Sequence, residues 1–144
     1  MANTLYDSAR ALFAKGQIDW ESDTIHCFLV NASYTFNVGH TKLTAIDGSA
    51  NGPRDYGTSV AAGIALTNKG VQTNGAIFAD SVRFVTCAAG RPAVTAIVLA
   101  RIGVDDANSD LIYYADVATG LPITPNGGDI IVTWSTGTNR ILRL

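Results

Sequence analysis

Charged residues are scarce in this chain. Only 15% of its 144 residues are Asp, Glu, Lys or Arg, and the net charge is −2, against roughly 25% charged residues in a typical soluble domain. With so few charges to face water, we expect part of the surface to be covered by other protein. Disorder is excluded, because it requires low hydrophobicity and 47% of these residues are hydrophobic. The length predicts a single domain over residues 1–144.

Basic clusters and long apolar runs are also missing. Lys15, Lys42 and Lys69 lie far apart, and the only close basic pair is Arg140 and Arg143. Proteins that bind nucleic acid need grouped Lys and Arg to displace phosphate counterions, so we expect no direct contact with nucleic acid. No apolar run has the length of a membrane span, and the first residues lack the pattern of a secretion signal. We therefore expect no membrane partner.

Few residues of the types used in catalysis or metal binding are present. Without an export signal, we expect Cys27 and Cys87 to be reduced and buried. His26 precedes Cys27 in a β-rich segment, and neighbouring strand side chains point to opposite faces, so these residues cannot readily share a metal. No G-x-S-x-G motif occurs, Glu21 is the only glutamate, and residues 105–110 lack the order of a calcium loop. We predict no enzymatic activity, no cofactor and no metal.

Residues 1–17 are predicted to form an N-terminal helix or arm. Asn3 or Thr4 can cap the helix, and Gly16 suits its C-terminal end. One apolar stripe is formed by Leu5, Ala9, Leu12 and Phe13. A helix of about four turns is marginal alone, so the stripe must pack either on its own domain or on a neighbouring subunit.

Residues 22–144 have the sequence pattern of an antiparallel β-sandwich. Short apolar or alternating segments are separated by turns rich in Gly, Asn, Asp and Pro, which predicts an all-β sandwich or barrel. The expected strands cover residues 24–30, 41–46, 60–66, 71–73, 76–85, 93–102, 111–117, 129–135 and 141–144. Residues 47–57 are expected to form a long exposed loop.

Aromatic residues in turns suggest contacts with a partner. For Trp20 we favour packing between the helix and the sandwich, whereas Tyr34, Phe36 and Tyr56 suit hinge packing and interface anchoring equally well. Stacking on a sugar ring is a third, weaker possibility. The candidate interaction surface comprises Leu5, Leu12, Phe13, Trp20, Tyr34, Phe36, Arg54 and Tyr56.

Five segments carry a recognisable pattern: residues 3–10 (NTLYDSAR), 16–20 (GQIDW), 23–25 (DTI), 75–82 (GAIFADSV) and 118–134 (ATGLPITPNGGDIIVTW). These segments resemble a family of small tailed-phage virion proteins. The resemblance is to capsid cement, or decoration, proteins. It implies a jelly-roll sandwich on the outer surface of the virion's capsid, present in the host cytoplasm during assembly.

The same resemblance implies the partners. They are the major capsid protein, whose neighbouring subunits the protein would bridge against internal DNA pressure, and further copies of the chain in a homodimer or homotrimer. Two alternatives stay open: a tail or adaptor protein of the virion, and a glycan-binding jelly-roll module with an aromatic platform of Tyr34, Phe36 and Tyr56.

Overall fold

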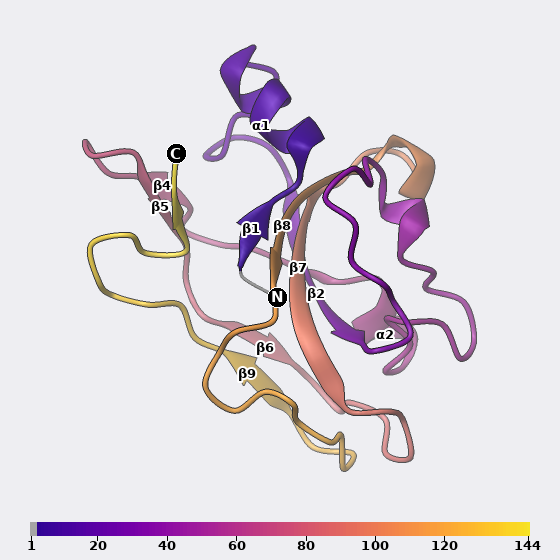
Figure 1. Cartoon of the computed structure of the whole chain (residues 1–144). Coiled ribbons are helices and arrows are strands. Elements are labelled where there is room, and N and C mark those ends of the chain that lie inside the picture. The colour runs from indigo at the N-terminus through magenta and orange to yellow at the C-terminus, as the bar shows by residue number, and fades with distance from the viewer. Residues whose placement is uncertain (1–2) are drawn as a thin grey trace.

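Strands dominate the structure, a computed structural model that describes residues 3–144 (Figure 1). The strands are β1 (Thr4–Leu5), β2 (Ile25–Asn31), β3 (Ile64–Ala65), β4 (Gly70–Val71), β5 (Ala76–Phe78), β6 (Val82–Phe84), β7 (Val94–Arg101), β8 (Asp110–Ala115), β9 (Ile130–Val132) and β10 (Leu142–Arg143). The helices are α1 (Asp7–Ala14) and α2 (Thr58–Ala61), with 3-10 turns at Leu43–Ala45 and Asp106–Asn108. Residues 1–2, which belong to the predicted N-terminal arm, lie outside the described residues.

The strands form a five-stranded sheet in the order β1-β8-β7-β2-β3, a three-stranded sheet β10-β5-β4 and a two-stranded sheet β6-β9. All the pairings between these strands are antiparallel. The all-β antiparallel class with a short N-terminal helix is therefore confirmed. The finer description as a jelly roll stays a prediction.

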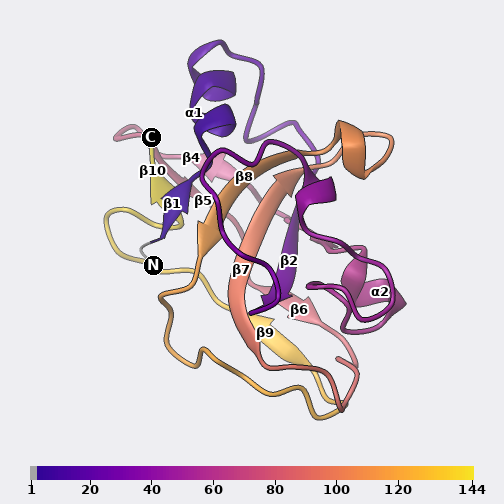
Figure 2. The ribbon, with the colours of Figure 1, turned by 45° about the vertical axis from the view of Figure 1, so that its right-hand side comes forward.

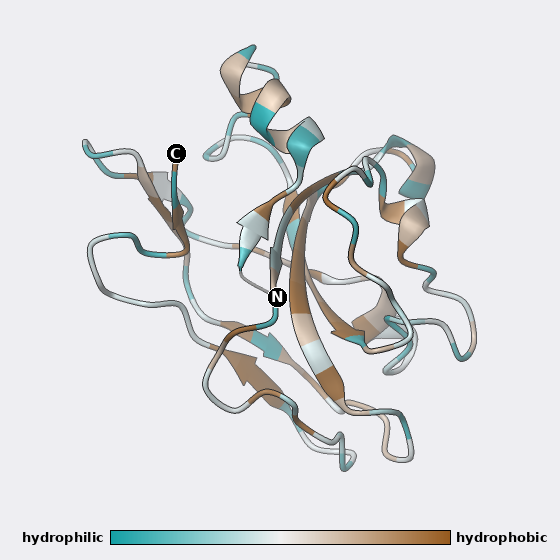
Figure 3. Cartoon of the chain, in the orientation of Figure 1, coloured by the Kyte–Doolittle hydropathy of each residue, from teal (hydrophilic) through white to brown (hydrophobic). Residues whose placement is uncertain are grey.

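The long strands β2, β7 and β8 are buried along nearly their whole length. Because alternate side chains of a strand point to opposite faces, such strands must be covered on both faces. The sequence shows the same property as nearly continuous apolar stretches, and most of β7 is coloured as hydrophobic in Figure 3. This sheet is the middle layer of the molecule.

A long connection covers one face of the central sheet. Phe28, Val98 and Tyr114 are register partners on β2, β7 and β8, so their side chains share a face. On that face the ring of Phe36 stacks on Tyr114 with centroids 4.4 Å apart, and the Arg54 guanidinium lies 5.2 Å from the centroid of the Phe28 ring. The chain between β2 and α2 thus forms the outer layer here (Figure 2).

The smaller sheets and their flanking segments cover the opposite face. Leu29 and Ile97, which are register partners, line a hollow together with residues of β9. Two indole nitrogens fasten this layer: Nε1 of Trp20 donates to the carbonyl of Phe78 at 3.0 Å, and Nε1 of Trp134 donates to the carbonyl of Asp80 at 3.0 Å. Trp20 is buried, and the partner of its indole nitrogen is the end of β5.

Helix α1 packs on its own chain. Ala9 is fully buried, Leu12 and Phe13 pack against the core, and the backbone N–H of Tyr6 donates to the carbonyl of Ile112 at 3.0 Å. The predicted stripe is therefore docked within the chain, with Leu12 and Phe13 only partly covered. The helix spans 7–14, which is shorter than the predicted arm of residues 1–17.

Two segments that were predicted as strands contain helical turns. Residues 41–46 contain the 3-10 turn Leu43–Ala45, and residues 60–66 hold the end of α2 followed by the two-residue strand β3. In the first segment Leu43 and Ile46 are both buried, and their spacing of three residues places both on one side of a tight turn. The predicted strand 76–85 is divided into β5 and β6 around Asp80.

Candidate interaction surface

The residue types of a metal or nucleophilic site are dispersed. Within residues 3–144, no group of three or more His, Cys, Asp or Glu side chains is arranged to hold a metal ion. His26 uses its Nδ1 in a hydrogen bond with the carbonyl of Ala62 at 3.0 Å, which is a structural role. Across this same stretch, no helix combines the length and apolarity that crossing a membrane requires.

The cysteines are free and buried, as expected from the sequence. Burial raises the pKa of the Cys27 thiol and of the Cys87 thiol. A raised pKa leaves little thiolate near neutral pH, and the thiolate is the reactive form. Both residues therefore act as small core side chains.

Most of the residues predicted to form an interaction surface belong to the core. Leu5, Trp20, Tyr34, Arg54 and Tyr56 each have at most 8% of their surface exposed. These side chains are therefore largely covered within the chain itself: Leu5 lies in β1 and Trp20 contacts the end of β5. Tyr34, Arg54 and Tyr56 lie in the connection that covers the central sheet. Of the predicted surface, Leu12, Phe13 and Phe36 keep partial exposure.

Tyr34 and Phe36 belong to an aromatic cluster with Tyr6 and Tyr114. The hydroxyl of Tyr34 lies 3.0 Å from the Tyr6 hydroxyl and 2.8 Å from Nδ1 of His40. Burial raises the pKa of Tyr6 and, to a smaller extent, that of Tyr34. The Tyr34 hydroxyl therefore finds its hydrogen-bond partners inside the fold. The aromatic cluster fixes the loop after β2 and does not present a flat aromatic surface to solvent.

The long loop 47–57 is likewise not exposed throughout, because Arg54 anchors it. The Arg54 side chain donates from Nε to the carbonyl of Ile46 at 2.8 Å, from Nη1 to the carbonyl of Ala61 at 2.5 Å, and from Nη2 to the carboxylate of Asp106. Its planar fork satisfies two backbone carbonyls and one carboxylate at once, and its face covers the Phe28 ring. Arg54 therefore clamps the loop onto the sheet.

A polar hollow of about 500 Å³ lies over this clamp. The charged groups around it have partners within the chain: Arg91 lies 3.0 Å from the carboxylate of Asp55, and Asp47 accepts a hydrogen bond from the backbone N–H of Ser49 at 2.9 Å. Hydrogen bonds from backbone N–H groups lower the pKa of both Asp47 and Asp55. These bonds stabilise the loop, and they leave the hollow without a convergent set of groups for a ligand.

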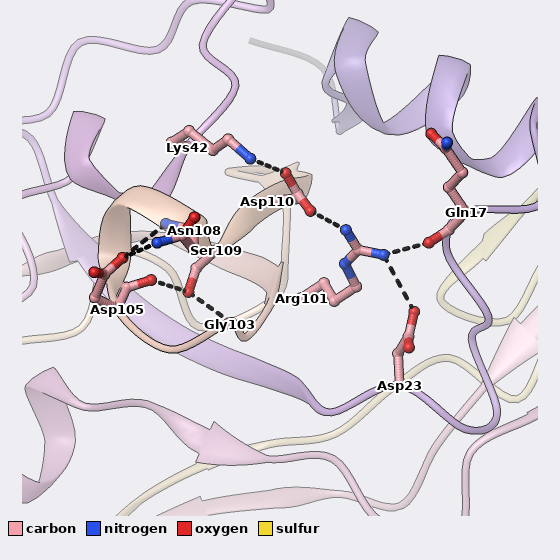
Figure 4. Close-up of polar contacts among 9 residues, drawn as sticks. All are labelled: Gln17, Asp23, Lys42, Arg101, Gly103, Asp105, Asn108, Ser109 and Asp110. Carbon is pink, nitrogen blue, oxygen red and sulfur yellow. Dashed lines mark hydrogen bonds and ion pairs between the residues drawn. The ribbon is translucent and has the colours of Figure 1, made fainter.

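A second ionic cluster fastens the start of the sandwich (Figure 4). Asp110, only 5% exposed, lies between the guanidinium of Arg101 and Nζ of Lys42, the latter 2.5 Å from Oδ1. Arg101 also binds the carbonyl of Gln17 and lies 3.6 Å from the carboxylate of Asp23. The cluster joins β7 and β8 to the segment after α1, so its role is structural.

A further concave surface runs from β8 and β9, past β1 and β10, to α1. It consists of neighbouring hollows of about 380, 340 and 420 Å³. The first two share Asn3, Tyr113 and Ile141, and the last two share Leu5, Arg10 and Arg143. We call this continuous surface the arginine groove, because its charged side chains are Arg10, Arg140 and Arg143.

The side chains that line the arginine groove carry an excess of positive charge. Arg10 lies 3.9 Å from the carboxylate of Asp7, whereas Arg140 and Arg143 form no ion pair among the described residues. Among the described residues, no Asp or Glu side chain lines any of its hollows. Phe13 and Leu144 contribute apolar surface at one end, and Trp134 does so at the other. An apolar floor bordered by cations, on a chain with a net charge of −2, is suited to protein recognition.

Of the residues that form the groove, Leu5 and Phe13 were among the predicted contacts. Arg140 and Arg143 were visible as the only close basic pair, and Arg10 lies on the predicted helix. Their placement on one surface could not be predicted, because it depends on β10 pairing with β5, more than sixty residues earlier, which brings Arg143 beside Arg10 of α1.

Comparison with known proteins gives no assignment. No protein-family model matches the chain, and no curated protein matches it significantly.

Proposed function

We propose that this chain is a tailed-phage structural protein: a capsid cement, or decoration, protein that binds the outside of the major capsid protein shell. On this proposal it acts as a homodimer or homotrimer, makes and breaks no covalent bond, and needs no cofactor. It would be found on the outer capsid surface of the virion and in the host cytoplasm during assembly. A jelly-roll description of its β-rich fold belongs to the same proposal.

The arginine groove is the observation that carries the proposal. It is a concave surface on which three arginines and apolar groups come together, and two of these arginines, Arg140 and Arg143, have no ion-pair partner among the described residues, whereas Arg10 pairs with Asp7. The low share of charged residues and the sequence segments that resemble phage virion proteins support the same conclusion. A protein that works by adhesion requires such a surface and no catalytic constellation.

Such a protein stabilises the capsid because its binding is coupled to the assembly equilibrium of the shell. Packaged DNA is highly charged and stiff, and it pushes outward on the shell. A protein that binds the assembled lattice and not separated subunits shifts the equilibrium toward the assembled lattice. An oligomer engages several capsid subunits at once, so weak individual contacts suffice.

The test is binding to expanded capsids built from the major capsid protein of the same genome. We expect the purified chain to co-sediment with these capsids to a saturating ratio, and not with separated capsid subunits. Virions that lack the chain should release DNA at a lower temperature, or on milder chelation, than complete virions. Absence of co-sedimentation together with unchanged virion stability would refute the proposal.

A tail or adaptor role remains the second candidate, because it requires the same adhesive chemistry. Immunogold labelling of particles separates the two, with label on the head supporting the cement role. The glycan-binding alternative loses its basis: Tyr34 and Tyr56 are buried, and Phe36 is stacked against Tyr114.

A further inference from the structure

Two open strand edges border the arginine groove. Strand β1 ends the five-stranded sheet and β10 ends the three-stranded sheet, so each has one side without a partner strand. Residues of both strands line the same hollows. Figure 2 shows the two strands near each other below α1. The edges therefore meet across the groove.

The pairing pattern places backbone groups toward this groove. In antiparallel pairs the backbone groups of successive residues point alternately toward and away from the partner. Tyr6 donates to the carbonyl of Ile112 at 3.0 Å, so the N–H of Leu5 points away from β8. Leu144 donates to the carbonyl of Gly75 at 3.0 Å, so the N–H and carbonyl of Arg143 point away from β5.

Arg140 adds an unsatisfied donor beside these edges. Its backbone lies in the left-handed region with φ 51°, which is uncommon for residues other than Gly. Its Nε is buried and has no hydrogen-bond partner within residues 3–144, although its guanidinium lies 5.9 Å from the centroid of the Phe78 ring. A carboxylate entering the hollow that Arg140 lines would form a charge-assisted pair with its guanidinium.

We propose that the arginine groove binds an extended acidic segment of a partner protein, which adds as a strand to the open edge of β10. The segment's backbone would pair with Arg143, an acidic side chain would meet Arg10, Arg140 or Arg143, and a large apolar side chain would cover Phe13. This mode of recognition takes affinity from backbone pairing and specificity from side-chain pockets. The inference deepens the proposed function, because on that function the segment belongs to the major capsid protein.

The experiment uses a display library of random 12-residue peptides selected on the full chain. We expect enriched peptides to carry Asp or Glu within a few residues of a large apolar side chain. The double variant Arg10→Glu with Arg143→Glu should weaken their binding by about tenfold or more, and added salt should weaken it in the wild type. Hydrogen exchange should slow at the amides of Leu5 and Arg143 when a peptide is bound.

A matched control is Lys69→Glu with Arg83→Glu, which changes the net charge equally at positions outside the groove. Arg140→Gly serves as a second variant, because Gly adopts positive φ without strain and the fold should persist while peptide binding falls. Both groove variants are first checked for unchanged circular dichroism.

The outcomes separate this inference from the proposed function. Selected peptides without acidic residues, equal loss in the control variant, or no slowing of exchange at β1 and β10 would overturn the inference. Self-association abolished by the groove variants would assign the groove to a second copy and also overturn it. Co-sedimentation with capsids that is unaffected by the groove variants would leave the function standing and refute this inference. Acidic peptides that bind, combined with no capsid binding, would refute the function alone.

Discussion

The guanidinium of Arg54 lies 5.2 Å from the centroid of the Phe28 ring, and this contact joins the long loop to strand β2 of the central sheet. Only 5% of Arg54 is exposed, yet its donors are satisfied by the carbonyls of Ile46 and Ala61 and by Asp106. A buried charge is tolerated when its hydrogen-bonding capacity is met in this way. Residues 54–56 of the loop 47–57 are therefore part of the core, while most of residues 47–51 face solvent.

Replacing Arg54 should cost more than replacing an exposed arginine. Arg54→Ala leaves the two carbonyls without a donor and uncovers Phe28, so we expect the free energy of unfolding to fall by about 2–4 kcal/mol. Arg83→Ala removes an ion pair in which the arginine side chain is 63% exposed, and it should cost at most about 1 kcal/mol. Urea denaturation of both variants measures the difference, and equal losses would contradict the clamp.

Asp110 should be the most sensitive carboxylate of the Figure 4 cluster. Asp110→Asn leaves Arg101 and Lys42 without their shared counter-charge in a site where the Asp110 side chain is 7% exposed. We expect a loss of about 1–3 kcal/mol in unfolding free energy. The control Asp7→Asn, whose side chain is 65% exposed, should change it by about 0.5 kcal/mol. A control loss as large as that of Asp110→Asn would refute the structural role.

Acid should destabilise the loop 47–57. Backbone hydrogen bonds lower the pKa of Asp47 and Asp55 in the folded chain, so the unfolded chain takes up protons first as pH falls. Their stabilisation is present above the unfolded pKa of about 4 and is lost as pH falls through the folded pKa. Denaturation measured from pH 6 to pH 3 should show a shallower decline for Asp55→Asn than for wild type. If stability falls with pH equally in wild type and in Asp55→Asn, then Asp55 contributes nothing to the acid sensitivity.

Neither cysteine should react in the folded protein. Burial raises the pKa of the Cys27 and Cys87 thiols, and both side chains are fully buried. At pH 8 an aromatic disulfide reagent should therefore modify neither thiol quickly, whereas both should react in denaturant. Rapid labelling of one thiol in the native chain would show that its surroundings open readily.

The sequence predicted the strands best where burial is greatest. The expected segment 93–102 matches β7, and 111–117 overlaps β8, because strands covered on both faces keep long β-rich apolar stretches. The prediction failed for residues 41–46 and 60–66, where short apolar segments suit a tight turn or a single helical turn as well as a strand.

The candidate surface was harder to predict than the fold. A loop with Gly, Asn and Pro resembles an exposed turn, and only the completed sheet provides Phe28 as the surface that buries Arg54. Tyr56 lies in the same loop and is likewise buried: its ring is fully covered, and this burial raises the pKa of Tyr56 to about 12. The groove arginines come from both ends of the chain, so local patterns could not bring them together.

The most direct test of the central claim is an electron cryomicroscopy map of the intact particle. The account predicts density for this β-rich fold on the outside of the shell, in contact with neighbouring capsid subunits through the groove between α1 and β10. Density for the chain in the tail, or a complete particle that does not contain the chain, would contradict it.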